Sequence, residues 1–383
     1  MRKLKRKLLV LLMLMLTMGG LFLPVQAQLP EEDIQAQMEA LGVDELEGQI
    51  PSETRSIMEE AGIGELSPEM LLNLSPRDFF RALWKMFLQK LRSPTKMLAS
   101  LAGIVILCAL LGGMKQAGWE GSLSGVFDTV SVLCVITAIS SPILDCIIDT
   151  AKAIQEAAVF MISFIPAFSA ALVASGQAIT GATYSMFLFS TCQVISQVVS
   201  QTLIPLMGIY LALCIIGSLS PGINMNSAAG AIKTTVSWSL GFITTVFVGL
   251  LSIQTMVAQS ADTVTAKTAK FLIGSFVPVV GGALSEAYTA AQGCLRLLKT
   301  SLGAYGILVA LLIFLPILLQ TVTWYLLSQA AAMVGDIMGV SRVSAILKAC
   351  STVLGMLIAV ILCFALLVIV STTVVMVVGM GSA

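Results

Sequence analysis

The sequence contains no histidine and little charge of either sign: charged residues make up 11% of its 383 residues, against roughly 25% in an average soluble domain. Histidine is the usual general base, a common zinc ligand and the partner in Ser-His and Cys-His nucleophile pairs. Its absence argues against most hydrolases and many metal sites. We therefore expect no enzyme and no catalytic, cofactor-binding or metal-ligating residues.

Two further features are missing. The eight cysteines show no CxxC spacing and all lie in the apolar part of the chain, so neither a disulfide framework nor a metal cluster is expected. No stripe of lysine and arginine interleaved with aromatic residues occurs in a polar segment of useful size. The sequence therefore does not indicate a protein that binds nucleic acid.

Apolar residues are abundant instead, at 57% of the chain. Thirteen of the 21 acidic residues precede position 97, and only 17 charged residues of both signs follow, from Leu98 to Ala383. A water-exposed surface cannot be built from such a composition, and the long apolar runs suit a hydrocarbon core about 30 Å thick. The pattern predicts a polar front segment followed by an all-α, polytopic membrane domain that contacts lipid.

The first 27 residues have the three parts of a signal peptide. A basic n-region spans residues 2–7, an apolar h-region runs from Leu8 to Leu23, and Val25-Gln26-Ala27 offers small residues at the cleavage positions. An uncleaved anchor is the alternative, because the h-region could span a membrane with some tilt. Either arrangement places residue 28 onward outside the cytoplasm.

Residues 28–75 are acidic and interrupted by glycine and proline, which is typical of a small helical or partly disordered segment. In residues 76–96, apolar residues recur at helical spacing and basic residues take the opposite side, which predicts an amphipathic helix at the membrane surface. The alternative is that this helix packs on protein. Its basic residues would favour the cytoplasm, but the signal sequence acts first and predicts the outside.

Residues 97–383 form the predicted transmembrane domain, with seven to nine crossings. No dyad alternation typical of a β-barrel is present, so the crossings are expected to be helices. The candidate spans are Met97–Met114, Val126–Ile148, Ala157–Ser175, Ala182–Ser200, Leu203–Leu219, Thr234–Ala258, Phe271–Leu284, Leu302–Ala330 and Ala349–Val378.

A weak internal repeat divides this domain into halves at about 157–260 and 270–378. The motif Ser163-Phe164-Ile165-Pro166 recurs 112 residues later as Ser275-Phe276-Val277-Pro278. Prolines at equivalent positions of duplicated halves often mark broken helices along a substrate path. Pro166 and Pro278 are therefore candidate functional residues, although each proline could equally kink a helix for packing.

Glu286 directly follows the second motif and is the third candidate, because ionisable residues within spans are often functional. A position in an interfacial loop is the alternative. The nearby basic residues indicate a cytoplasmic location for this neighbourhood. They are Lys267, Lys270, Arg296 and Lys299.

The signal sequence, the acidic and then amphipathic front and the run TAKTAKFLIGSFVPVVGGALSEA at 265–287 together resemble the stage III sporulation protein AE family. The resemblance covers essentially the whole chain and is most specific in that run and in the stretch from Gly293 to Gly306. It implies a membrane component of the sporulation channel of endospore-forming bacteria, made in the mother cell and placed in the membrane around the forespore.

The resemblance also implies partners, namely a cytoplasmic ATPase and ring-forming extracytoplasmic proteins of the same channel, and it brings no catalytic residues. Two other classes remain open. An autonomous secondary transporter would use the repeated halves around a site near the midplane, and an intramembrane enzyme would need paired aspartates or a Ser/Lys dyad within the spans.

Overall fold

The computed structural model describes residues 46, 48–60, 81, 85, 88, 102–108, 110, 123–219, 225–276 and 281–377. Within these ranges it leaves out the side chains at 60, 123–125, 127, 128, 226, 269, 270, 272–294 and 296–298. The predicted signal peptide and most of the front region lie outside the described residues. In the predicted amphipathic segment 76–96, the described residues Arg81, Lys85 and Leu88 are helical and exposed.

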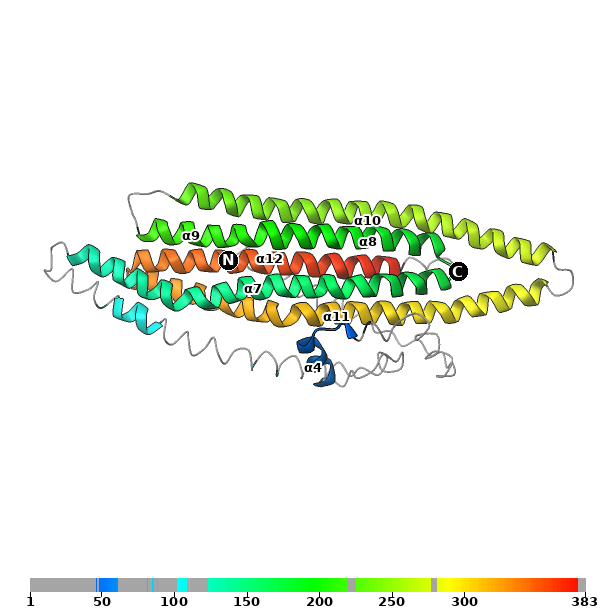
Figure 1. The fold of residues 1–383 in the computed structure, drawn as a ribbon, viewed down its shortest axis with the longest axis horizontal. Helices are drawn as coiled ribbons and strands as arrows, with labels where there is room; N and C mark the ends of the chain where they lie inside the picture. The colour runs from blue at the N-terminus through cyan, green and yellow to red at the C-terminus, as the bar shows by residue number, and fades with distance from the viewer. Residues whose placement is uncertain are drawn as a thin grey trace.

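The described chain is helical and forms a bundle of long, nearly parallel helices (Figure 1). The bundle is built from α7 (Leu123–Ala174), a continuous helix α8–η1–α9 (Ala178–Leu219), α10 (Asn226–Phe276), α11 (Gly281–Ile337) and α12 (Ser341–Val377). The short helix α4 (Ser52–Glu60) lies against α11. An all-helical architecture is what a lipid solvent requires, since each backbone N–H must find a partner within its own helix.

Five helices among the described residues are long and apolar enough to cross a membrane. Their candidate spans are Thr129–Ala174, Ala178–Leu219, Ser227–Thr268, Lys299–Ile337 and Ser341–Val377. The expected seven to nine crossings are not confirmed. The two spans expected within 126–175 lie in one uninterrupted helix, and the two expected within 182–219 lie in another.

The expected span Phe271–Leu284 lies where α10 ends and α11 begins. The expected span Met97–Met114 is described only at 102–108 and 110, which are helical. Stretches with charged residues or glycine, which separated the expected spans, thus lie inside helices more than 30 residues long.

Prolines do not end these helices. Pro142 and Pro166 lie inside α7, and Pro316 lies inside α11. Before Pro205 the helix widens into a π-helical turn, Val199–Leu203. Proline has no N–H and clashes with the carbonyl four residues earlier, and a locally wider turn relieves that clash while the helix continues.

Two tight turns connect consecutive long helices, and each depends on a glycine with positive φ. Gly176 (φ 86°) closes the α7–α8 turn, and Gly339 (φ 74°) closes the α11–α12 turn. At both turns the residue after the glycine donates its N–H to a carbonyl five residues earlier, at 3.0 Å for Gln177 and 2.9 Å for Val340. This is a Schellman motif, which satisfies helix-end carbonyls and reverses the chain.

Helices α11 and α12 form the most extensive pair, and α7 packs on both. On α7, Phe160, Phe164 and Phe168 stack with ring centroids 5.7 and 5.4 Å apart, and Phe168 meets Tyr184 of α8 edge-on at 5.3 Å. A Cβ on Gly306 would lie 2.2 Å from the Phe164 ring. Only glycine permits this approach, as expected where lipid provides no hydrophobic drive and backbones must come close.

The repeat is not confirmed by the helix pattern. Pro166 lies inside α7, several residues before the α7–α8 turn, whereas Ser275 and Phe276 end α10 and Pro278 lies outside the described residues. The two copies of the motif therefore occupy different places relative to the helix ends.

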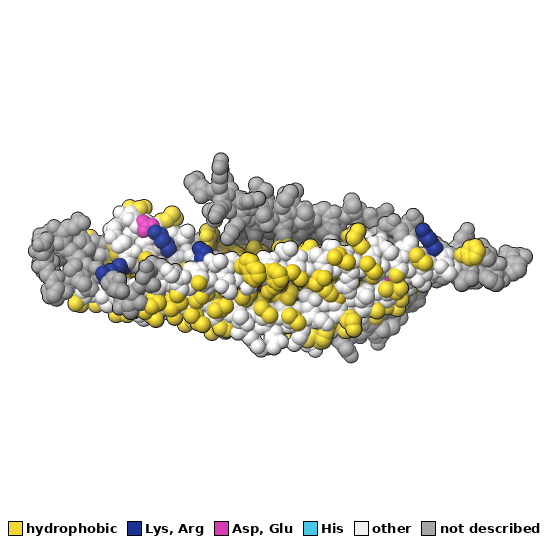
Figure 2. Space-filling model, turned by 90° about the horizontal axis from the view of Figure 1, so that it is seen from above, with side chains coloured by type: hydrophobic (Ala, Val, Ile, Leu, Met, Phe, Trp, Pro, Cys, Tyr) yellow, Lys and Arg dark blue, Asp and Glu magenta, His cyan; other side chains and the backbone are white. Residues whose placement is uncertain are grey.

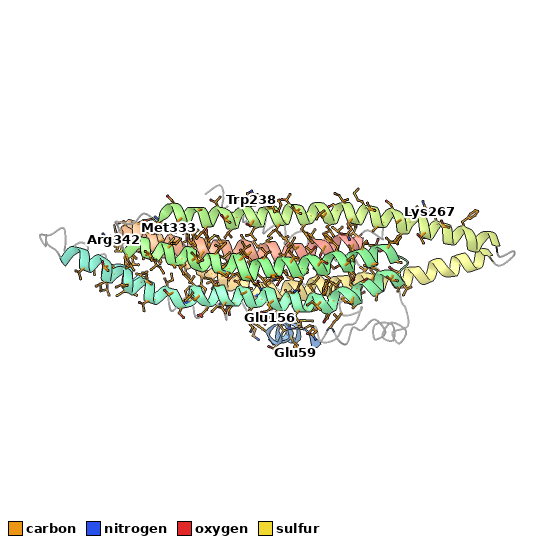
Figure 3. The ribbon with its side chains drawn as sticks, turned by 45° about the horizontal axis from the view of Figure 1, so that its top comes forward. Glu59, Glu156, Trp238, Lys267, Met333 and Arg342 are labelled. Carbon is orange, nitrogen blue, oxygen red and sulfur yellow. The ribbon has the colours of Figure 1, made fainter. Side chains whose placement is uncertain are left out.

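Charged side chains are few on the bundle surface. On the face shown in Figure 2, those that are described lie in two end regions, and the stretch between them is apolar or uncharged. Figure 3 places Lys267 towards one end of the bundle and Arg342 towards the other, with Glu156 between them. Large apolar side chains such as Met186 (77% exposed) and Met256 (70%) face outwards, as the surface of a membrane protein requires.

Candidate functional site

Polar groups from three helices converge on the α7–α8 turn. The carboxylate of Asp262 on α10, which is 7% exposed, accepts the backbone N–H groups of Ile179 at 2.9 Å and Thr180 at 2.8 Å. These belong to the first turn of α8, where N–H groups have no partner inside the helix and the helix dipole is positive. Asp262 therefore caps α8 from a neighbouring helix, 83 residues away from Ile179 in sequence.

Lys299 of α11 reaches the same turn. Its side chain is 2% exposed, and its Nζ donates to Oε1 of Gln177 at 3.0 Å. Gln177 precedes α8 and makes no side-chain cap on it, since its amide oxygen is directed to Lys299. Buried charges are costly unless they are hydrogen-bonded. The hydrogen bonds of Asp262 and Lys299 therefore hold α10 and α11 against the α7–α8 turn.

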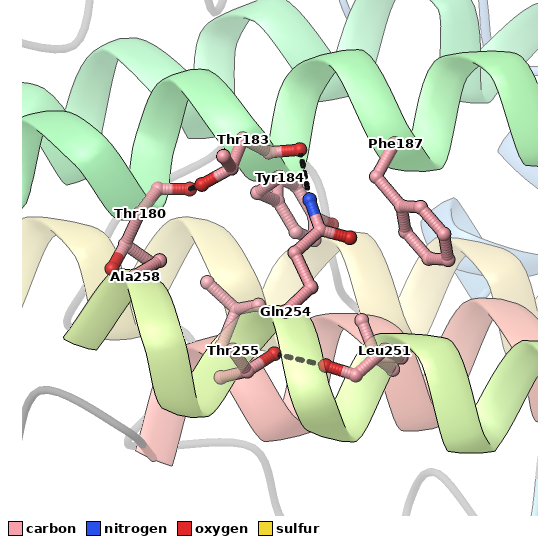
Figure 4. A pocket seen from close by; sticks show the side chains of 9 residues that line it. Thr180, Thr183, Tyr184, Phe187, Leu251, Gln254, Thr255 and Ala258 are labelled. Carbon is pink, nitrogen blue, oxygen red and sulfur yellow. Dashed lines mark hydrogen bonds between the residues drawn. The ribbon is translucent and has the colours of Figure 1, made fainter. Parts of the chain in front are cut away.

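A small polar niche lies next to this turn, between α8, α10 and α12 (Figure 4). Its lining residues are Thr180, Thr183, Tyr184, Phe187, Leu251, Gln254, Thr255, Ala258 and Val375. The Gln254 side-chain N–H donates to the backbone carbonyl of Thr183 at 2.7 Å, and the Thr255 hydroxyl donates to that of Leu251 at 2.7 Å. Its volume of about 10 Å³ is roughly the minimum for one water molecule.

One hydroxyl in the niche has no partner. Thr180 is 2% exposed and its Oγ1 makes no hydrogen bond, which costs about 1–3 kcal/mol for a buried polar group that stays dry. Deeper in the bundle, the Tyr184 hydroxyl lies 3.5 Å from Oγ1 of Thr372 on α12. Phe187 of α8 and Phe247 of α10 stack with ring centroids 5.7 Å apart, so the contact between these two helices is apolar at that point.

The niche can hold a small neutral hydrogen-bonding molecule such as water, and it lacks the side chains for chemistry. Its lining contains hydroxyl, amide and apolar groups but no carboxylate, amine or thiol. Across the part of the chain that is described, no group of three or more Cys, Asp or Glu residues could hold a metal ion. The site therefore favours positioning of helices over catalysis.

The structure does not gather the three residues singled out from the sequence. Pro166 is exposed on α7, several residues before that helix ends at Ala174. Pro278 lies outside the described residues, and Glu286 is in the helical backbone of α11 with a side chain that is not described. Asp262, Gln177 and Thr180 were missed as a group. Asp262 is one of the few charged residues after Leu98, and no spacing rule links it to residues 179 and 180.

A second polar contact links α7 and α11 further along the bundle. The side-chain N–H of Gln320 donates to the Asp149 carboxylate at 3.2 Å. Beyond it, at the α11–α12 turn, Lys348 pairs with Asp336 at 2.7 Å, and Ser344 donates to both Asp336 and the Ala332 carbonyl. These contacts join neighbouring helices.

Comparison with known proteins shows a match to a family model and to a relative. The family model described as "Stage III sporulation protein AE" matches residues 64–379. The chain is 26% identical over 246 residues to the stage III sporulation protein AE of Bacillus subtilis (strain 168). That alignment covers 63% of this chain and 60% of the relative, so the chain spans less than two thirds of the relative's length. No solved structure matches the chain.

Proposed function

The chain belongs to the stage III sporulation protein AE family, and from this premise we propose that it is a membrane component of a multiprotein sporulation channel between the mother cell and the forespore. The family match is the observation that carries the proposal. The five long apolar helices support it, because they supply a membrane-embedded body. The described helices contain no constellation that suggests a separate enzymatic task.

The proposal includes the surroundings of the protein. The chain would be made in the mother cell and lie in the membrane around the forespore, with its front region between the two membranes. Its partners would be a cytoplasmic ATPase and ring-forming extracytoplasmic proteins. In that assembly it would act as a conduit or platform that sustains forespore development after engulfment.

Deletion of the gene tests the process. We expect sporulation to stop after engulfment, with loss of late forespore gene expression, and a second copy of the wild-type gene should restore both. Normal spores in the deletion strain would reject the proposal. Impaired vegetative growth on one nutrient, with normal sporulation, would instead support a transporter.

The secondary-transporter alternative gains no support from the described geometry. The SFxP motifs do not occupy equivalent positions, and the niche has room for about one water molecule. Glu286→Gln tests whether this residue lines a transport path, as the transporter alternative requires. We expect normal spore yield if Glu286 is an interfacial residue, whereas a loss of spores with normal protein levels would place it on a functional path. Glu156→Gln, a change of a partly exposed glutamate that pairs with Lys152 on α7, is the matched control.

A further inference from the structure

Four contacts mark two levels along the bundle axis. At the first level, Asp262 and Lys299 meet the α7–α8 turn through residues 177–180. The second level is marked by Glu156 on α7 and Gln320 on α11. Gln320 bonds Asp149, which lies seven residues, about 10 Å, before Glu156 along α7, so the two markers agree to within about two helical turns. Glu156 precedes Gln177 by 21 residues, and Gln320 follows Lys299 by 21 residues. At about 1.5 Å per residue, both separations are about 32 Å, close to the hydrocarbon thickness of a bilayer.

Between these two levels no helix carries a charge. The sequence has no Asp, Glu, Lys or Arg from 157 to 232, from 234 to 261, from 300 to 335 or after 348. These ranges cover the corresponding parts of α7, α8, α10, α11 and α12. The second limit is set by Glu156 on α7, since the uncharged runs on the other four helices extend past it. A section without charge on all five helices, about as long as the hydrocarbon is thick along α7, is what the hydrocarbon core demands.

We propose that the hydrocarbon of the bilayer surrounds only this section of the bundle, which we call the apolar section. The part beyond Glu156 and Gln320, called here the projecting section, stands outside the hydrocarbon. α7 extends 33 residues before Glu156, about 50 Å, and α11 extends 17 residues past Gln320, about 26 Å. At the opposite end, α10 runs 14 residues past Asp262, about 21 Å.

Placing the bilayer around the projecting section would expose charges to lipid. Lys152 and Glu156 pair at 3.6 Å with side chains 72% and 36% exposed, and Lys348 and Asp336 pair with side chains 55% and 45% exposed. These side chains are between 36% and 72% exposed, so a bilayer at this level would contact charged groups. Each charged residue near the centre of a membrane helix costs about 2.5–3.5 kcal/mol.

Exposed apolar side chains do not decide the placement, because both sections have them. Trp238 (67% exposed) and Ile337 (85%) lie in the projecting section, and Ile253 (64%) lies in the apolar section. The position of α4 agrees with the charges. This helix carries exposed Glu53, Arg55 and Glu59, and Figure 3 places Glu59 at about the same level along the bundle as Glu156, where charged side chains would meet water and lipid headgroups.

Four native methionines test the placement without any substitution. Met186 and Met256 are exposed in the apolar section, and Met333 and Met338 are exposed in the projecting section, at 57% and 41%. The full chain would be reconstituted in lipid nanodiscs and treated with a water-soluble oxidant. Sulfoxide formation at each methionine would then be followed by mass spectrometry.

We expect Met333 and Met338 to oxidise faster than Met186 and Met256 by an order of magnitude, although the latter pair is the more exposed in the bare protein. Equal rates, or faster oxidation of Met186 and Met256, would overturn the placement. Unfolding the chain in denaturant should equalise all four rates, which shows that local sequence is not the cause.

Cysteines introduced along the exposed side of α10 locate both boundaries. The changes are Ala231→Cys in the projecting section, Ile253→Cys and Val257→Cys in the apolar section, and Thr265→Cys past Asp262. We expect the first and last to react with a polar maleimide in nanodiscs and the middle two to be protected. Protection at position 231 together with reaction at 253 would move the bilayer to the projecting section. The readout does not depend on sporulation, so it separates this proposal from the channel function.

Discussion

Helices α10 and α11 are similar in length and both are apolar enough to cross a membrane, yet they lie in different surroundings. In the most apolar stretch of α11, 72% of the residues are buried by protein, against 22% in α10. α11 packs on α12, α7 and α10, whereas α10 presents Trp238 and Phe242, stacked at 5.2 Å, to the outside. Apolar composition thus reports that a helix avoids water, and only packing shows whether protein or lipid replaces it.

The difference follows from small residues and cross-helix polar contacts. α11 brings Gly303 and Gly306 against the Phe168 and Phe164 rings, and α12 and α7 close around it. On α10, a methyl group added at Gly241 or Gly249 would meet no atom within 4 Å. Glycines of the same type therefore mark close packing on one helix and open surface on the other.

The largest expected effect comes from charging the lipid-facing side of α10. Met256→Lys should reduce the amount of protein in the membrane, because a lysine in the apolar section costs up to about 3 kcal/mol. Met333→Lys is the matched control on α11 in the projecting section and should leave the amount nearly unchanged. Quantitative immunoblotting of membrane fractions measures both. Equal losses would mean that the two positions share one environment.

The next effect tests packing of the inner helices. Gly306→Ala places a methyl group within 3 Å of the Phe164 ring and should destabilise the fold by about 1–3 kcal/mol. Gly249→Ala on α10 meets no atom, so it should be neutral or stabilise by up to about 1 kcal/mol through helix propensity. Thermal unfolding in detergent compares the two. If both substitutions change the unfolding temperature by the same amount, Gly306 is not packed more closely than Gly249.

A smaller effect is expected where α10 does contact the bundle. Asp262→Ala removes the acceptor for two N–H groups of α8 and should cost about 0.5–2 kcal/mol, the range for a lost helix cap. Asp145→Ala is the control, because that exposed carboxylate has only a 3.5 Å contact with Ser141 on its own helix. Asp262→Asn should fall between the two, since one acceptor oxygen remains. A value for Asp262→Ala equal to that for Asp145→Ala would show that the cap contributes little.

Much of the fold was accessible from the sequence. The absence of charge over long runs predicts membrane helices, because the requirement of lipid for satisfied backbone groups leaves no other element, and the all-helical structure of the described residues agrees. The number of helices was not accessible. The expected spans Val126–Ile148 and Ala157–Ser175 left residues 149–156 between them. Lys152 and Glu156 in this stretch form an i,i+4 pair on α7, which continues through them unbroken.

The polar niche was not accessible either. Thr180 and Thr183 on α8 and Gln254 and Thr255 on α10 are ordinary residues of membrane helices, with no motif spacing between them. They meet because the hydrogen bonds of Asp262 to the start of α8 fix the position of α10 along α8. Pro166 and Pro278 did stand out in the sequence, but helices absorb prolines through local widening or packing, so a proline predicts no site by itself.

The sequence by itself determined the solvent of this protein, its helical class and its family, because these depend on composition, on runs without charge and on matching residues along one chain. Tertiary structure decided which helices are inside, which charged side chains reach the α7–α8 turn and that the buried hydroxyl of Thr180 has no hydrogen-bond partner. Those features depend on distances between residues tens of positions apart. Such distances are set by packing of side chains against glycines and by single cross-helix hydrogen bonds, which leave no periodic trace in the sequence.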